Sequence, residues 1–183
     1  AWSAMSACAR SAPASTTAGG IDPAFEQAWR AITPVAVPAP PGPEKVTVAI
    51  FLDWQCPACR AEYRAYTPVL AEIQAAHPGA VRVLMKDFPL NSRCNAVVQW
   101  LFANQESLTP DSVKAAAVSV GQIPDFAARY DGVVKAIAED VQAGATLQIR
   151  STPSVFVNGR LARLDERLLS AAEFRQALLI ELR

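Results

Sequence analysis

The sequence predicts an α/β fold for this chain of 183 residues, and three features support that prediction. The nearly all-apolar segment Val46–Leu52 has the composition of a central strand that is buried on both faces. A helical pattern, Pro57–Ala76, follows directly, although Pro68 inside it is expected to kink or split the helix. A second apolar strand pattern, Val81–Met85, comes next. These elements form a first βαβ unit.

A second unit lies near the end of the chain. Ser154–Val157 is predicted as a strand, Asn158-Gly159 as a type I′ turn, and Arg160–Leu164 as the returning strand. Ser170 and Glu173 form a capping-box pattern that starts the last helix. The order of elements is therefore βαβ, an insert, and ββα.

The insert, at about residues 95–146, has no strand signal. Thr109-Pro110 and Ile123-Pro124 each place a proline where a helix begins, and Gly121 and Gly144 stand where helices commonly stop. The insert is therefore expected to be helical.

Residues 1–44 are expected to be a disordered leader that contains a short helix and a proline-rich linker. Residues 1–20 are rich in Ala, Ser, Thr and Gly without periodicity. Asp22 is suited to cap a helix that begins at Pro23, and the segment Thr33–Lys45 then carries five prolines. One compact domain, residues 45–183, follows this leader.

Charge and hydropathy narrow the class of protein. Lys and Arg together number 17, as do Asp and Glu, and no basic stripe is present, so a nucleic-acid partner is not expected. The apolar runs are strand-sized and shorter than the roughly 20 residues that span a bilayer. The chain begins with Ala1, which suggests a processed protein or an excised domain, with a signal peptide or a membrane helix upstream.

Cys56-Pro57-Ala58-Cys59 stands where the first strand meets the first long helix, and a C-x-x-C at such a junction is a thioredoxin-like redox signature. Unpaired N–H groups and the helix dipole stabilise a thiolate at this position. Cys56 is therefore expected to be the reactive sulfur and Cys59 its partner, one turn further in. The Cys56–Cys59 disulfide would be the redox group, and no other cofactor is expected.

Other polar residues near this motif are weaker candidates. Arg60 either adds positive potential near Cys56 or is a solvated surface residue. Asp53, Glu62 and Lys86 have side chains that can move or orient a proton, but such residues more often lie at the surface or cap helices. We therefore leave all four out of the predicted catalytic set.

The remaining cysteines do not predict a metal site. The four cysteines are irregularly spaced and the chain has one histidine, His77, whereas a structural zinc site needs a second close pair. Cys8 is expected to be a free thiol in the leader, since "MSAC" matches an acylated lipoprotein motif poorly.

Three segments, "FLDWQCPAC", "KDFPLNSRCN" and "STPSVFVNG", resemble in order and spacing the DsbA-like branch of the thioredoxin superfamily. The likeness covers about Lys45 to Arg183. Within that branch the second segment looks most like thioredoxin-like domains fused to, or partnered with, bacterial vitamin K epoxide reductase homologues. The resemblance implies a thioredoxin fold (βαβ…ββα) with an inserted helical subdomain.

The resemblance also implies roles for individual residues. Cys56 would be the exposed nucleophile and Cys59 the buried resolving thiol. Pro153 would be a cis-proline facing this pair, and Thr152 would offer backbone hydrogen bonds to a bound substrate strand. Cys94 is a candidate third redox cysteine, or else an idle thiol, because the segment after it is short and lacks a partner cysteine.

The expected function is oxidation of cysteines in extracytoplasmic proteins, with reoxidation by a quinone-linked membrane partner of the vitamin K epoxide reductase or DsbB type, alone or fused upstream. We expect a periplasmic or otherwise extracytoplasmic monomer, with an upstream segment as a membrane tether. Two alternatives stay open: a disulfide reductase or isomerase of the same fold, and a non-catalytic binding module with a structural C-x-x-C. Because Pro57-Ala58 lacks the histidine of strongly oxidising DsbA, the expected reduction potential lies between about −270 mV and about −120 mV.

Overall fold

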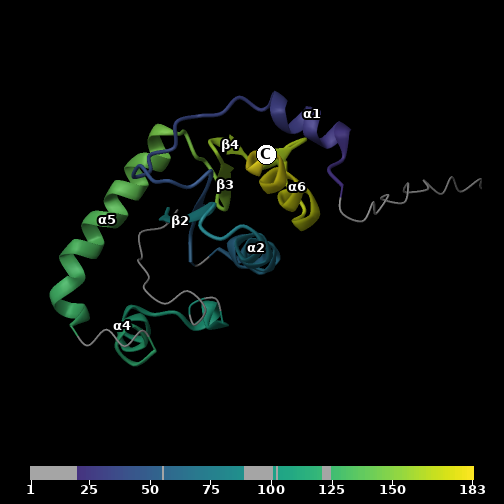
Figure 1. The fold of residues 1–183 in the computed structure, drawn as a ribbon. Coiled ribbons are helices and arrows are strands. Elements are labelled where there is room, and N and C mark those ends of the chain that lie inside the picture. Colours follow the sequence, from purple (N-terminus) through teal and green to yellow (C-terminus); the bar gives the residue numbers. More distant parts are fainter. Residues whose placement is uncertain (1–19, 55, 89–100, 102, 121–124) are drawn as a thin grey trace, which may run out of the picture.

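The computed structural model describes residues 20–54, 56–88, 101, 103–120 and 125–183 (Figure 1). The predictions for residues 1–19, for Cys94, for Gly121 and for Ile123-Pro124 lie outside the described residues. A four-stranded sheet in the order β2-β1-β3-β4 forms the centre of the fold. Its strands are β1 (Val46–Leu52), β2 (Val81–Asp87), β3 (Ser154–Val157) and β4 (Arg160–Leu161).

The sheet has the topology that the order of elements predicts. Strand β1 pairs in parallel with β2, from Val46 opposite Val81 to Leu52 opposite Asp87. On its other edge β1 pairs antiparallel with β3. The predicted α/β class is confirmed, and β2 runs two residues beyond its predicted end at Met85.

Two helices cover one face of this sheet and a third covers the other (Figure 1). Helix α2 (Pro57–Ala76) and helix α6 (Ala171–Leu182) pack together on the first face, and α5 (Phe126–Thr146) contacts β2 on the second. Of the two expected effects of Pro68, a kink or a split, the split is wrong, because α2 continues through the proline. Tyr66, Leu70 and Ile73 flank the proline and are buried against the core, which holds the helix together.

The second unit differs from its prediction at one point. Asn158 and Gly159 have positive φ values of 47° and 78°, as a type I′ turn requires. The predicted returning strand breaks at Ala162, which is fully buried and donates its N–H to Val155 O. Beyond the break, β5 (Arg163–Leu164) pairs with β6 (Arg167–Leu168) as a separate hairpin.

The expected short helix, α1 (Pro23–Ala31), begins after an Asp22 cap, as predicted. Its Trp29 is completely buried and donates from Nε1 to Glu181 of α6 at 2.9 Å. The proline-rich linker is also fixed to the sheet, since Val35 donates its N–H to Gly159 O. The folded unit therefore includes residues before 45, which the sequence analysis assigned to a leader.

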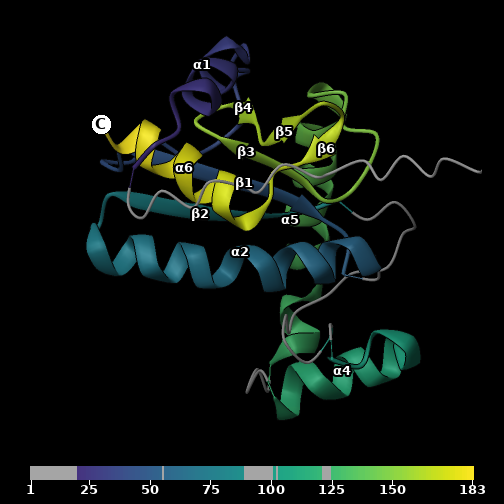
Figure 2. The same cartoon turned by 90° about the vertical axis from the view of Figure 1, so that its right-hand side faces the viewer.

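The described part of the insert is helical, and its α4 (Pro110–Ser119) end lies away from the sheet (Figure 2). It consists of the short 3₁₀ helix η1 (Gln105–Ser107), helix α4 and α5. Helix α4 begins at Pro110, as the Thr109-Pro110 pattern predicted, and Thr109 caps it in a capping box with Ser112. Gly144 does not end a helix as expected, because α5 continues to Thr146. None of the described helices is both long and apolar enough to cross a membrane.

Candidate active site

Cys56 occupies the N-cap of α2, immediately before Pro57 at the first helical position. Its backbone is extended, with φ −81° and ψ 119°, and its N–H donates to Asp53 O at 3.0 Å. No side-chain hydrogen bond caps this helix end. The thiol of Cys56, which is only partly buried, therefore lies where the free N–H groups and the dipole of a 20-residue helix favour a negative charge.

Cys59 lies one turn further into α2 and is 2% exposed. Burial raises the pKa of its thiol to about 12, and the Asp53 N–H, which donates to the Cys59 sulfur at 3.5 Å, offsets only part of that effect. Both cysteines are free thiols in the structure. At neutral pH Cys59 is thus a protonated, shielded thiol, and Cys56 is the accessible sulfur.

Thr152 and Pro153, almost a hundred residues further along the chain, lie against this pair. The Thr152–Pro153 peptide bond is cis. The Cys56 thiol donates to Thr152 O at 3.4 Å, and Pro153 lines the same pocket as Cys59. The structure therefore brings together four of the five predicted site residues; the fifth, Cys94, lies outside the described residues. Their chemical roles stay predictions.

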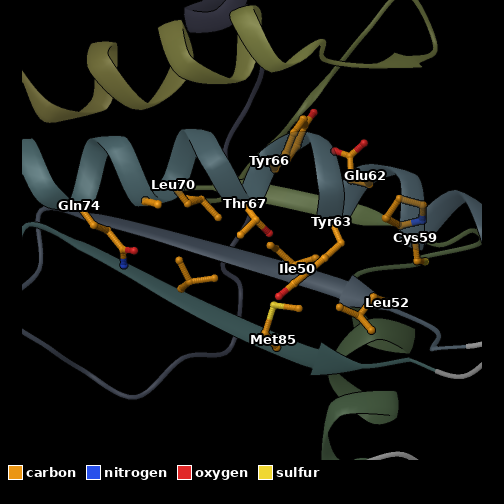
Figure 3. Close-up of a pocket in the computed structure, with 13 residues that line it drawn as sticks. Ile50, Leu52, Cys59, Glu62, Tyr63, Tyr66, Thr67, Leu70, Gln74 and Met85 are labelled. Carbon is orange, nitrogen blue, oxygen red and sulfur yellow. The ribbon is translucent and has the colours of Figure 1, made fainter. Parts of the chain in front are cut away.

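A pocket of about 250 Å³ lies between α2 and the strands β1 and β2, with Cys59 at one end and Gln74 at the other (Figure 3). Its wall is mainly apolar, and Ile50, Leu52, Val83 and Met85 supply the sheet side. The pocket is therefore a largely apolar space that reaches the buried sulfur.

The structure also places the polar residues that were left out of the predicted catalytic set. Glu62 lines the same pocket as Cys59, although its carboxyl group points away from Cys59 in Figure 3. Burial raises the pKa of its carboxyl, and Tyr66 and Arg163 oppose this shift. Lys86 forms an ion pair with Asp140 at 2.6 Å. Asp53 contributes its backbone groups to the site. Among the described residues, no group of three or more His, Cys, Asp or Glu is arranged to hold a metal ion.

Sequence reasoning missed a set of contacts beside the reactive pair. The indole N–H of Trp54 donates to the carboxylate of Asp87, and the backbone N–H of Asp87 donates to Asp140 Oδ2 at 3.0 Å. Gln105 donates from its side chain to Trp54 O at 3.1 Å. These partners are 33 to 53 residues apart. No local pattern in the sequence indicates them, apart from the position of Trp54 two residues before Cys56.

Solved structures share this fold, although no family model and no curated protein matches the chain. The catalytic domain of Proteus mirabilis ScsC is 18% identical, with a TM-score of 0.57 over 76% of this chain and 84% of that one. Oxidoreductase DsbA from Xylella fastidiosa is 16% identical, with a TM-score of 0.54 over 78% of this chain and 87% of that one.

A third similar structure is MdbA, a thiol-disulfide oxidoreductase from Corynebacterium diphtheriae. It is 13% identical, with a TM-score of 0.55 over 74% of this chain and 84% of that one. At such low identities the likeness shows the fold: this chain has the thioredoxin-like fold of DsbA-like proteins, with an inserted helical part.

Proposed function

We propose that this chain is a thiol-disulfide oxidoreductase that exchanges disulfides with protein thiols through Cys56 and Cys59. One observation carries the proposal: a partly exposed thiol lies at the N-cap position of a long helix, and a buried thiol with a high pKa lies one turn behind it. An exchanging dithiol needs this asymmetry, because one sulfur must be open to attack and must also leave readily as a thiolate.

The reaction begins with a Cys56–Cys59 disulfide and a reduced client protein. A client thiolate attacks Cys56 Sγ; the bond between Cys56 and Cys59 breaks, and Cys59 leaves and takes up a proton. A second client thiolate then attacks the client sulfur of the mixed disulfide and releases Cys56 as a thiolate. The client loses two electrons and gains a disulfide, and the pair Cys56 and Cys59 is reduced. No cofactor other than the cysteine pair takes part in this exchange.

Thr152 and Pro153 are the proposed client-binding residues. Thr152 O lies 3.4 Å from the Cys56 sulfur, so a client chain bonded to that sulfur would run beside this backbone. Main-chain hydrogen bonding of an extended client to residue 152 requires no particular client sequence. Such binding suits an enzyme with many clients.

The proposed direction is oxidation, outside the cytoplasm, with a quinone-linked membrane oxidase of the vitamin K epoxide reductase or DsbB type as the electron acceptor. The resemblance of the sequence "KDFPLNSRCN" to domains linked to vitamin K epoxide reductase homologues supports this type of partner. Disulfides persist in extracytoplasmic compartments, which is where an oxidase of this kind has clients. The uncharged Pro57-Ala58 interior favours a reduction potential between those of thioredoxin and DsbA.

The first test is alkylation of the reduced full chain at mildly acidic pH, followed by mass spectrometry. We expect Cys56 to be modified first and Cys59 to be protected. In Cys59→Ser the mixed disulfide with a reduced client should accumulate, and in the matched control Cys56→Ser it should not form. If Cys56 reacts no faster than Cys59, a binding module with a structural C-x-x-C fits better than an enzyme.

A second measurement separates oxidase from reductase. An oxidase restores the activity of a reduced, unfolded client protein faster than oxidation by air alone does. A reductase instead precipitates insulin in the presence of dithiothreitol. A potential as low as that of thioredoxin, about −270 mV, would exclude the oxidising direction.

A further inference from the structure

The helical insert holds the backbone that leads into Cys56 by contacts at two places. Gln105, in η1, donates from Nε2 to Trp54 O at 3.1 Å. Asp140, in α5, accepts from Lys86 Nζ at 2.6 Å and from the backbone N–H of Asp87 at 3.0 Å. Asp87 in turn accepts the indole N–H of Trp54. The insert therefore contacts Trp54 directly and through the end of β2.

Asp53, the neighbour of Trp54 in the chain, contacts both cysteines. Asp53 donates its N–H to Cys59 Sγ at 3.5 Å and accepts the N–H of Cys56 at 3.0 Å. Trp54 is 6% exposed and Asp53 is 6% exposed, so water replaces these hydrogen bonds poorly when one of them is lost. A shift of the Trp54 backbone would thus move the groups that fix the geometry of the reactive pair.

We propose that Asp140 is a positioning residue for thiol-disulfide exchange, through which the helical insert sets the reactivity of Cys56 and Cys59. Asp140 fixes Asp87, Asp87 fixes the Trp54 indole, and Trp54 fixes the turn that carries Cys56. This inference rests on the proposed function, since it concerns how the exchanging pair is tuned.

Two carboxylates and one cation meet around Asp140. Burial raises the pKa of Asp87, the Trp54 indole opposes that shift, and the charge of Asp140 adds to it. Lys86 balances the charge of Asp140 in an ion pair that is largely shielded from water, since only 18% and 17% of the two side chains are exposed. One cation thus allows two carboxylates to lie side by side and to hold both the backbone and the indole.

The direction of the expected effect follows from the hydrogen bond that Asp53 donates to Cys59 Sγ at 3.5 Å. A reduced sulfur, above all one that carries negative charge, accepts such a bond more strongly than a disulfide sulfur does, so the contact favours the dithiol form. A shift of Trp54 and Asp53 that weakens it should therefore raise the free energy of the dithiol form relative to the disulfide form. In Asp140→Ala we expect the equilibrium with glutathione to move toward the disulfide about fivefold, the factor that corresponds to one ordinary hydrogen bond.

The experiment measures this equilibrium constant in the full chain for four variants. Asp140→Ala removes both contacts of the carboxylate, and Asp140→Asn keeps an acceptor for the Asp87 N–H. Trp54→Phe removes the indole donor. The matched control is Asp125→Ala, also in the α5 region, whose carboxylate pairs with Arg129 at the surface. We expect a smaller shift for Asp140→Asn than for Asp140→Ala, and no shift for Asp125→Ala.

A double mutant shows whether Asp140 acts through Trp54. If it does, Asp140→Ala combined with Trp54→Phe shifts the equilibrium less than the sum of the two single changes. The indole N–H signal of Trp54, assigned in ¹⁵N-labelled protein by its loss in Trp54→Phe, should move in Asp140→Ala and stay in place in Asp125→Ala.

Two results would contradict the inference, and they are distinguishable. If the wild-type cysteines do not equilibrate with glutathione at all, the proposed function fails and the inference fails with it. If the wild type equilibrates normally and Asp140→Ala lowers only the melting temperature, with the equilibrium constant unchanged, then Asp140 is a structural residue and the proposed function stands.

Discussion

The two faces of the sheet are packed very differently. The face under α2 and α6 carries the larger apolar cluster, which includes Trp29 of α1, Tyr66 and Phe174. The face under α5 carries a smaller cluster whose buried members are phenylalanines and alanines: Phe51, Phe88, Phe156, Ala49 and Ala143. The helix that bears the cysteines thus packs on the face with the larger apolar cluster.

The contacts on each face show what this difference means for the site. Tyr66 of α2 stacks on Phe174 of α6 with ring centroids 3.8 Å apart and donates its hydroxyl to Leu169 O at 2.6 Å. On the other face, Phe51 meets Phe88 and Phe156 edge to face at about 6 Å. We infer that the first face supplies most of the stability and a firm base for α2, whereas the second face mainly attaches the insert.

The largest effect is expected for Trp29→Ala, on the first face. Trp29 is completely buried and also donates to Glu181, so its truncation should cost about 3–5 kcal/mol of unfolding free energy, measured by chemical denaturation. Val118→Ala, at a side chain that is 49% exposed on α4, should change it by less than about 0.5 kcal/mol. If Trp29→Ala costs no more than this control, α1 does not belong to the core.

A smaller effect is expected for Gly144→Ala, on the second face. A Cβ at this position would lie 2.2 Å from Phe88 Cε2, and Phe88 is 8% exposed and has little room to move. We expect a loss of about 1–3 kcal/mol in the same assay.

Gly132→Ala is the matched control in the same helix, because its Cβ would meet nothing within 4 Å. Alanine is a better helix former than glycine, so this change should stabilise the protein by about 0.5–1 kcal/mol. If both substitutions stabilise the protein, Phe88 yields easily and the second face is loosely packed.

The position of Gly144 also shows where sequence reasoning ends. A glycine near the end of a helical pattern predicts a stop, yet here the missing side chain admits a ring from 56 residues earlier in the chain. The same holds for Trp54, whose partners come from β2 and from the insert. Contacts between distant segments leave no periodic trace, so the sequence could not indicate them.

Features with a local cause were predicted well. An apolar strand that runs into a helix, Asn158-Gly159 between two strands, and the Ser170 and Glu173 capping box each follow from the chemistry of adjacent residues. The turn at Asp165 and Glu166 was missed, because both residues adopt positive φ without a glycine. The proximity of Thr152 to Cys56 came only from the family resemblance, since 96 residues separate them.

The smallest effect on the free energy of unfolding is expected for Glu62→Gln. This change tests whether the edge of the first face, where Glu62 lies on α2, tolerates a charged carboxylate. Burial holds the pKa of Glu62 above its ordinary value, although Tyr66 and Arg163 oppose the shift. A carboxyl with a raised folded-state pKa contributes stability below its unfolded-state pKa, and that contribution is lost as the pH rises through the folded-state value. Glu62→Gln should therefore stabilise the protein near neutral pH and match the wild type at about pH 3.

Glu72→Gln, in the same helix, provides a comparison of opposite sign. Arg175 donates to Glu72 and lowers the pKa of that exposed carboxyl, so its contribution is present above the unfolded-state pKa and is lost as the pH falls. Glu72→Gln should weaken the protein slightly near neutral pH, and this difference should vanish in acid. Unfolding curves across the pH range check both variants. If both variants change the unfolding free energy in the same direction, the carboxyl of Glu62 is as solvated as that of Glu72. The packing of α2 against α6 would then not extend to Glu62.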